Sequence, residues 1–448
     1  MLEVSVIETS GLGDRSYLVN DGDVAVAIDP QRDIDRVLEL LGDLRITHVL
    51  ETHIHSDYVT GGLALAGVVG AEYVLPAGED VAFPCRAVSE GDRIDSGGIH
   101  LEVLLTPGHT HHHVSYVLRE DSGQIVAVFT GGSLLIGSTG RTDLLGDEHT
   151  AELSRLQYRS VRRLAEELPA KTQIYPTHGF GSFCSATSPT GDASTIEEQR
   201  GANPALTQNE QDYVDELLAG LSDFPAYYAH MGVINRAGPA PADLSPPTPV
   251  DPAELRARID AGEWVVDLRK RTAFAAGHLA GTYGFELSDS FVNYLGWLYA
   301  WGAPLTLIGD DTQQIADAQR ELSRIGVDRL TGSASGDIRA LADGTELRRY
   351  RVADFGELAD VLDDDDLVVL DVRQTGEFDS GHVRDAVNVA LHELSERIAD
   401  IPADRELWIH CASGYRASVA AALLDRYDLD VVLIDDEFTN AEKLGITS

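Results

Sequence analysis

One cysteine of this sequence lies in a setting that suits chemistry on sulfur. Cys411 follows an apolar run and precedes a run with the pattern of a helix, so we expect it in a short loop between a strand and that helix. Backbone N–H groups of such a loop and of the helix N-terminus stabilise a thiolate and make it nucleophilic at neutral pH. Arg416 can hold an anionic sulfur substrate through its planar guanidinium. A lone cysteine is more often a buried structural residue, but this setting favours a catalytic thiol. The loop residues expected to surround the bound sulfur are Ala412, Ser413, Gly414 and Tyr415.

Histidines form a second group with the spacing of a chemical site. His53, His55 and Asp57 lie at positions i, i+2 and i+4 directly after a predicted strand, and His109 and His178 each follow a later one. Neutral imidazoles together with a carboxylate suit zinc or iron. A single histidine is more often a core or surface residue, but several at the ends of strands are typical of a metal site. We therefore predict a metal site among these five residues.

Three blocks of sequence would position these groups. Residues 1–236 alternate short β-rich runs with glycine-bounded turns and end in a helical stretch, where Thr207 is expected to cap a helix. The segment from Ala237 to Pro252 holds six prolines and indicates a linker over residues 237–250. The remaining residues contain a repeat.

The repeat consists of Asp-x-Arg followed by Gly-His. Its copies begin at Asp267 and Asp371, and both parts recur at the same offset of 104 residues (267 to 371 and 277 to 381). A shared spacing of this length indicates two duplicated α/β domains rather than a solenoid. We place these domains at residues 251–345 and 355–448.

The second copy resembles a single-domain rhodanese. The resemblance implies a sulfurtransferase in which Cys411 accepts sulfane sulfur as a persulfide, from thiosulfate or another sulfane-sulfur donor, and passes it to a thiol or cyanide. The first copy resembles a rhodanese without its nucleophile, because Asp310 aligns with Cys411 and a carboxylate cannot carry a persulfide. We expect the first copy to be structural or to serve docking. The matching motifs of the second copy are Asp371-Val372-Arg373, Glu377-Phe378, Gly381-His382 and Cys411 to Arg416.

The N-terminal block resembles the metallo-β-lactamase superfamily, an αββα sandwich, and looks most similar to its persulfide dioxygenase and glyoxalase II branch. The run Phe-Thr-Gly-Gly-Ser-Leu-Leu at 129–135 and the run Gly-Arg-Thr-Asp-Leu at 140–144 resemble those of the dioxygenases, as does the order of domains. The resemblance implies an enzyme that uses non-haem Fe(II) and O₂ to oxidise a low-molecular-weight thiol persulfide to sulfite and free thiol. It places His53 and His109 on two ligand positions and Arg141 near the anionic end of the substrate.

Two positions depart from the family pattern. Gly132 stands where the family has a carboxylate ligand, and Tyr58 replaces the last histidine of the HxHxDH motif. A two-metal site of the glyoxalase II type would therefore lose two of its ligands. A cluster of three histidines remains, which resembles a catalytic zinc site with one open position, and Asp57 would supply a carboxylate for iron if its loop allows. The histidines of this cluster are His53, His55 and His109.

Three functions therefore stay open for the N-terminal domain. The leading one is a persulfide dioxygenase with Fe(II), coupled to sulfur transfer through Cys411. The second is a thioester hydrolase of the glyoxalase II type with Zn(II). The third is a metal-free scaffold for the terminal rhodanese. In each case we expect a multidomain α/β and α+β protein, with an αββα sandwich before two rhodanese-like domains with parallel sheets.

Composition narrows the setting and the partners. The 448 residues include three cysteines without a CxxC pair, which is no disulfide framework. No run has the roughly 18 apolar residues of a membrane span, and the N-terminus lacks the pattern of a signal peptide. We expect a cytoplasmic protein, and members of such families often form homo-oligomers.

The net charge of −40 is the unusual feature of the composition, with 74 acidic residues against 34 basic ones. Such a surface repels nucleic acid and anionic membranes, so neither is an expected partner. Because the acidic residues are spread along the whole chain, we interpret them as the hydrated surface of a halophilic protein rather than as an interaction tail.

This charge predicts that the protein is least stable in low salt, where its carboxylates repel one another without screening. Raising the ionic strength from about 0.1 M to about 1 M shortens the Debye length from about 10 Å to about 3 Å. We expect the unfolding temperature to rise over this range when it is followed by circular dichroism. A flat or falling unfolding temperature would contradict the interpretation.

Overall fold

The protein was analysed in a computed structural model, which describes residues 2–186, 191–364 and 366–448. The chain forms two compact units, residues 1–243 with 323–326 and residues 244–322 with 327–448. The domain boundaries at 236, 250 and 345 stay predictions. Among the described residues, no helix has the length and apolar character needed to cross a membrane.

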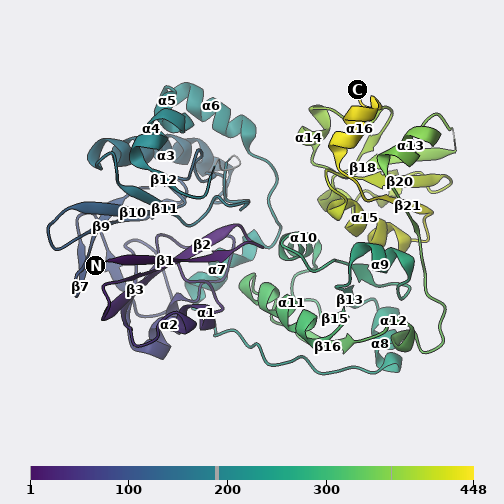
Figure 1. The fold of residues 1–448 in the computed structure, drawn as a ribbon, viewed down its shortest axis with the longest axis horizontal. Coiled ribbons are helices and arrows are strands. Elements are labelled where there is room, and N and C mark those ends of the chain that lie inside the picture. The colour runs from purple at the N-terminus through teal and green to yellow at the C-terminus, as the bar shows by residue number, and fades with distance from the viewer. Residues whose placement is uncertain (1, 187–190, 365) are drawn as a thin grey trace. The chain divides into compact units, whose positions relative to one another are not determined.

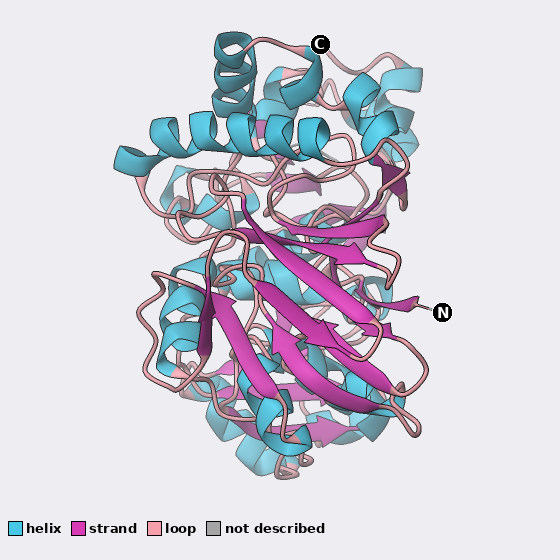
Figure 2. Cartoon of the chain, turned by 90° about the vertical axis from the view of Figure 1, so that its left-hand side faces the viewer, coloured by secondary structure: helices cyan, strands magenta, loops and turns pink. Residues whose placement is uncertain are grey.

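The N-terminal unit has two six-stranded sheets with helices on their outer sides, as Figures 1 and 2 show. The first sheet has the order β1-β2-β3-β4-β5-β6, and the second has the order β12-β11-β10-β9-β8-β7. The strands are β1 (Glu3–Thr9), β2 (Asp14–Asn20), β3 (Val24–Ile28), β4 (Arg45–Leu50), β5 (Glu72–Pro76), β6 (Arg86–Val88), β7 (Arg93–Ser96), β8 (Ile99–Leu105), β9 (Val114–Arg119), β10 (Ile125–Gly131), β11 (Gln173–Pro176) and β12 (Ser194–Thr195). The helices are α1 (Asp35–Glu39), α2 (Gly62–Val69), α3 (Asp147–Glu167), α4 (Ile196–Ala202), α5 (Pro204–Thr207), α6 (Glu210–Gly220) and α7 (Tyr228–Ala237).

Side chains that point alternately to the two faces of a strand form the cores of this sandwich. In β3, Val24, Val26 and Ile28 join the core between the two sheets, whereas Ala25 and Ala27 belong to the cluster that includes residues of α1 and α2. Successive side chains of a strand point to opposite faces, so a strand that is apolar throughout needs cover on both faces. On the second sheet α3 to α6 supply that cover (Figure 1), with buried residues of α3 packed against β9 and β10.

The predicted metal-site residues meet at one edge of this sandwich. Strands β4, β8, β10 and β11 all end at the edge where the loops with His53, His109, Gly132 and His178 begin. Loops held by a rigid sheet are the usual location of functional residues.

The second unit contains two parallel sheets, with the orders β14-β13-β15-β16 and β17-β21-β20-β18-β19. Together with the first unit, these sheets confirm the predicted fold class. The strands are β13 (Trp264–Asp267), β14 (Tyr283–Gly284), β15 (Leu305–Gly309), β16 (Leu330–Ser335), β17 (Arg351–Ala353), β18 (Leu367–Asp371), β19 (Val387–Asn388), β20 (Glu406–His410) and β21 (Val431–Ile434). The helices are α8 (Pro252–Asp260), α9 (Arg271–Ala276), α10 (Phe291–Leu298), α11 (Thr312–Arg324), α12 (Ile338–Ala342), α13 (Phe355–Val361), α14 (Thr375–Asp379), α15 (Tyr415–Asp425) and α16 (Phe438–Leu444), with 3-10 helices at Leu391–Glu393 and Ile398–Asp400.

The repeated motif has the same structural role in both parallel sheets. In the first, Arg269 donates to Asp267 at 2.6 Å and to the Gly277 carbonyl at 2.9 Å. In the second, Arg373 donates to Asp371 at 2.7 Å and to the Gly381 carbonyl at 2.7 Å. The buried ion pair closes the loop after each equivalent strand, which explains why both parts of the motif recur together.

One capping expectation is wrong. Thr207 is the last residue of α5, and the cap of α6 is Asn209, whose side-chain oxygen accepts from the backbone N–H groups of Gln211 and Asp212. Threonine and asparagine are both good N-cap residues, so residue type alone could not show which of them begins the helix.

Candidate functional site

Three buried imidazoles converge at the loop edge of the N-terminal unit. The ring centroids of His53 and His109 lie 4.8 Å apart, and each lies 5.3 Å from that of His178. The Nε2 atoms of His53 and His178 are 3.3 Å apart. One nitrogen from each ring lies within 4.8 Å of the others, which is close enough to hold a single metal ion.

Hydrogen bonds fix the outer nitrogen of each of these rings. The Thr52 hydroxyl donates to Asp29, so Nδ1–H of His53 donates to that hydroxyl at 2.9 Å. Nδ1–H of His109 donates to the Arg141 carbonyl at 2.7 Å. The Nε2 lone pairs of His53 and His109 therefore face the cluster, and Nε2 of His109 is buried without a protein partner.

Two carboxylates orient the third ring. Nδ1 of His178 lies 2.9 Å from Asp14 and 3.0 Å from Asp57. Metal-binding histidines typically donate their other N–H to a carboxylate or a backbone carbonyl. Inward nitrogens, an unpartnered Nε2 and this outer support together fit a metal ion.

The pKa values distinguish His178 from the other two rings. Burial, together with the neighbouring imidazoles, holds the pKa of His53 well below its usual value and lowers that of His109 to about 3. Both rings are thus in the neutral form that binds metals. Burial opposes the charged form of His178 as well, but Asp57 and Asp14 outweigh it and raise its pKa to about 10.

The sequence grouped His55 with His53 and His109, but in the structure His55 lies beside buried carboxylates. Its Nε2 is 3.2 Å from Glu51 and 3.3 Å from Asp29, and its ring stacks on Tyr58 with centroids 4.3 Å apart. Although burial opposes it, the two carboxylates raise the pKa of His55 to about 9. The ring centroid of His55 lies 4.2 Å from that of His53, and its ligand atom groups with those of Asp57 and His178.

Asp57 stands beside the cluster rather than within the converging set. Its Oδ2 faces Nδ1 of His178, while its Oδ1 is buried without a protein partner. Asp57 can also form a group with His55 and His178 whose ligand atoms lie within 4.8 Å of one another. The loop therefore brings the predicted carboxylate to the edge of the metal site.

Gly132 has no room for the carboxylate that the family carries at this position. A Cβ atom there would lie 2.2 Å from Cδ2 of His109. The Gly132 N–H donates to Nε2 of His113 at 3.0 Å, which places that ring behind the cluster. The His109 ring occupies the space that a side chain at 132 would need.

Arg141 does not present its guanidinium to a substrate in this structure. The residue is 2 % exposed and makes two hydrogen bonds of 2.7 Å with Asp143. It also donates to the carbonyls of Phe183 and Ser222. These hydrogen bonds of the guanidinium hold the loop in place, and the Arg141 carbonyl in this loop accepts from His109.

Cys184, close in sequence to His178, is fully buried. Burial, reinforced by the charges of Asp57 and Asp14, raises the pKa of its thiol well above the usual value. This environment disfavours the thiolate, so Cys184 is a poor nucleophile here.

The predicted cysteine loop forms at the end of β20. Cys411 follows the strand directly, is 2 % exposed, and precedes α15, which begins at Tyr415. Gly414 caps this helix with a φ of +87°. A Cβ there would lie 2.2 Å from Asp435, so the loop needs glycine both for its backbone and for its neighbour.

Arg416 is paired within the protein. Glu377 accepts two hydrogen bonds from its guanidinium, at 2.5 Å and 2.8 Å. Burial opposes ionisation of Glu377, but Arg416 outweighs it and lowers the pKa of this carboxyl. The sequence marks Glu377 only as part of a motif, so this partner of Arg416 was missed.

Asp310 occupies the place of Cys411 in the first parallel sheet. It follows β15, which pairs with β13 as β20 pairs with β18. Asp310 is exposed, and its N–H donates to the Gln314 side chain at 2.7 Å. The loop that carries the thiol in the second module thus carries a carboxylate in the first.

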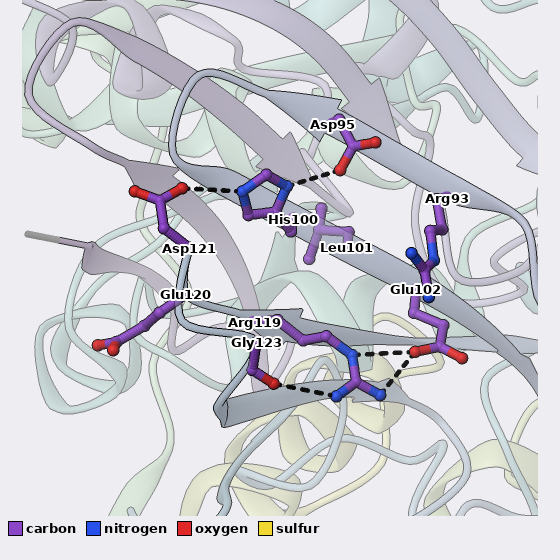
Figure 3. A pocket seen from close by; sticks show the side chains of 9 residues that line it. All are labelled: Arg93, Asp95, His100, Leu101, Glu102, Arg119, Glu120, Asp121 and Gly123. Carbon is purple, nitrogen blue, oxygen red and sulfur yellow. Dashed lines mark hydrogen bonds and ion pairs between the residues drawn. The ribbon is translucent and has the colours of Figure 1, made fainter.

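A surface groove on β7 to β9 contains none of the predicted site residues (Figure 3). His100 lies between Asp95 and Asp121, and Arg119 pairs with Glu102. Five of its charged side chains therefore pair within the groove.

Comparisons with known proteins match two separate parts of the chain. The pattern of the metallo-beta-lactamase superfamily matches residues 12–178, and that of the rhodanese-like domain matches residues 354–442. "Persulfide dioxygenase ETHE1, mitochondrial" of Bos taurus is 34% identical over 207 residues, covering 44% of this chain and 74% of the bovine protein. The chain belongs to the metallo-β-lactamase superfamily, alongside the persulfide dioxygenases. These matches confirm both resemblances drawn from the sequence.

Other members of the superfamily are similar too. A hydroxyacylglutathione hydrolase of Pseudomonas paraeruginosa is 33% identical over 155 residues, covering 34% of this chain and 56% of the hydrolase. The crystal structure of a metallo-beta-lactamase from Staphylococcus aureus matches with a TM-score of 0.67 and 28% identity, covering 75% of this chain and 99% of the other.

The geometry predicts a graded loss of metal. His109→Ala and His178→Ala each remove a converging nitrogen and should abolish stoichiometric binding. Asp14→Asn keeps the ligands but weakens the support of His178, which should cost about 10- to 100-fold in affinity. Metal content by mass spectrometry checks this order, with the exposed His112→Ala as the matched control. Full metal content in His178→Ala would refute the converging set.

Gly132→Asp restores the family residue but should lower metal content. The new side chain must displace the His109 ring, because its Cβ would stand 2.2 Å from that ring. Gly132→Ala, which adds the Cβ without the carboxylate, separates the two effects. A higher iron content in Gly132→Asp than in the unmodified protein would contradict this reasoning.

Proposed function

We propose that this protein combines two activities of sulfur metabolism: oxidation of a thiol persulfide at a single metal ion, and transfer of sulfane sulfur through Cys411. The observation that carries the first is the convergence of His53, His109 and His178 in a relative of persulfide dioxygenases. The loop of Cys411 between β20 and α15 carries the second.

The three histidines would hold the metal, with Asp14, Thr52 and the Arg141 carbonyl fixing their rings. Fe(II) bound there would supply redox chemistry with O₂, which a persulfide oxidation to sulfite requires. The residues themselves exclude water, because all three rings are buried. They also leave the fourth side of the cluster without a side-chain ligand at Gly132.

A zinc thioester hydrolase is the second candidate. A set of three histidines with an open position is a recognised catalytic zinc site, and the converging set contains no carboxylate. The similarity to a hydroxyacylglutathione hydrolase also supports a hydrolase function.

In the rhodanese-like domain, Cys411 would act as the nucleophile toward sulfane sulfur. The loop backbone and the N-terminus of α15 would stabilise the anionic sulfur. The proposal includes the domain boundaries given above and a cytoplasmic, halophilic protein. Its substrates would be O₂, a low-molecular-weight thiol persulfide, and thiosulfate or another sulfane-sulfur donor.

Metal identity and O₂ uptake distinguish the two candidates for the N-terminal domain. We expect protein purified anaerobically in high salt to hold about one iron ion per chain and to consume O₂ with glutathione persulfide. Zinc, no O₂ uptake and turnover of a glutathione thioester would instead identify the hydrolase. His112→Ala should behave as the unmodified protein in each assay.

Cys411→Ser should abolish transfer of sulfur from thiosulfate to cyanide and leave O₂ uptake unchanged. The substitution removes the sulfur nucleophile but keeps the size of the side chain. Cys85→Ser, at a half-buried cysteine outside the loop, is the matched control. Retention of full transfer activity by the Cys411 variant would reject the assignment.

A further inference from the structure

Arg271, at the start of α9 in the first module, binds two carboxylates near the cysteine loop of the second module. Its guanidinium donates to Glu286 of its own module at 2.8 Å and to Asp435 of the second at 2.6 Å. Its backbone N–H also donates to Glu286, at 3.2 Å. Helix α9 packs against α15, the helix that follows Cys411 (Figure 1). One side chain therefore connects the module without a cysteine to the module that has one.

Asp435 belongs to a segment that supports the cysteine loop directly. It follows β21, which pairs in parallel with β20, so Asp435 and Cys411 leave the sheet at the same edge. Its carboxylate lies against Gly414, where a Cβ atom would stand 2.2 Å from Oδ1. Three residues further on, the Phe438 N–H donates to the Ala412 carbonyl at 2.9 Å. This segment thus contacts two of the loop residues expected to surround the bound sulfur.

Glu286 belongs to a segment that supports the end of the same loop. The Tyr415 hydroxyl donates to the Glu286 carbonyl at 3.0 Å. Tyr415 is the first residue of α15, and the N-terminus of a helix favours a negative charge. Arg271 therefore reaches the loop at two places, at Gly414 through Asp435 and at Tyr415 through Glu286.

Arg271 and Glu286 are not part of the pattern that the two modules share. At the offset of 104 residues, their equivalents in the second module are Thr375 and Ala390 (271 to 375 and 286 to 390), which carry no charge. The ion pair that closes the loop after each equivalent strand is the recurring Asp-x-Arg pair. The pair of Arg271 and Glu286 is thus peculiar to the first module, which fits a role toward the second module.

The charge of Arg271 matters because carboxylates lie around the cysteine loop. Asp435 lies against the loop, and Glu377 accepts two hydrogen bonds from Arg416. A carboxylate near a thiol disfavours the thiolate unless a cation compensates its charge. Burial opposes the charge of Arg271, but its hydrogen bonds to Asp435 and Glu286 outweigh this and raise its pKa. Arg271 therefore stays charged and compensates the carboxylate that touches the loop.

We propose that Arg271 of the first module is a positioning residue for sulfur transfer in the second. It holds Asp435 and Glu286 so that the loop of Cys411 keeps its shape and tolerates a negative sulfur. The inference rests on the proposed sulfurtransferase function of Cys411. In the step that this loop serves, the Cys411 thiolate attacks the outer sulfur of thiosulfate. The new S–S bond forms as the donor S–S bond breaks, sulfite leaves with the electron pair, and Cys411 carries the persulfide anion.

Loading of Cys411 from thiosulfate, followed by intact mass of the full-length protein, tests this role. We expect Arg271→Gln to lower the maximal loading rate about 10- to 100-fold, because a displacement of about 1 Å at a reacting group can cost about 100-fold. The half-saturating thiosulfate concentration should change little, since Arg271 contacts partners of the loop rather than the donor. Arg271→Lys keeps the charge and should lie between. Arg258→Gln, which removes an ion pair with Glu254 inside the first module, is the matched control.

A second substitution separates positioning from a loss of folded protein. Adding Asp435→Asn to Arg271→Gln removes the uncompensated carboxylate and should restore most of the loading rate. Every chain of Arg271→Gln should still gain one sulfur atom at long times, because the loss concerns the rate rather than the fraction of folded protein.

Three results would overturn the proposal. They are a normal loading rate in Arg271→Gln, an equal loss in Arg258→Gln, and a double variant no faster than Arg271→Gln. A final sulfur content that falls in proportion to the rate would also overturn it, because it would show a loss of folded protein. Failure of the unmodified protein to load Cys411 would instead reject the sulfurtransferase function itself.

Discussion

The cluster of His53, His109 and His178 depends on one constraint: each buried imidazole must have its outer nitrogen satisfied by the protein. A buried polar group left without a partner costs about 1–3 kcal/mol, and three such rings would make the loop edge unstable. Thr52, the Arg141 carbonyl and the pair Asp14 and Asp57 meet this need. Because these partners take the outer nitrogens, the inner ones are left for a metal.

Asp29 extends the same constraint to the loops themselves. It is fully buried, with a φ of +49°, a conformation that costs energy in a residue other than glycine. Its carboxylate accepts from the Thr52 N–H at 2.7 Å and from the hydroxyls of Thr52 and Thr177. One carboxylate after β3 therefore fastens the loops after β4 and β11, which carry His53 and His178.

The sequence predicted the duplicated modules and the cysteine loop from local patterns, whereas the sandwich was expected from the family resemblance of the N-terminal block. Short apolar runs bounded by turn residues indicate strands such as β3, and the repeated ion pair of Asp371 and Arg373 leaves a spacing that can be read directly. The choice between His55 and His178 could not be read in this way. It depends on which ring brings a nitrogen within reach of His53 and His109, and only the fold determines that distance. The pairing of Arg416 with Glu377 was hidden for the same reason.

Both sites place their negative charge one step away from the reacting atoms. In the N-terminal unit, Gly132 removes the carboxylate that would bind a metal directly, while Asp14 and Asp57 act through His178. With glycine at position 132, the converging set contains three imidazoles and no carboxylate. In the rhodanese-like domain, Glu377 compensates Arg416 and weakens its pull on a dianion. In both sites a carboxylate therefore acts through another side chain, His178 or Arg416.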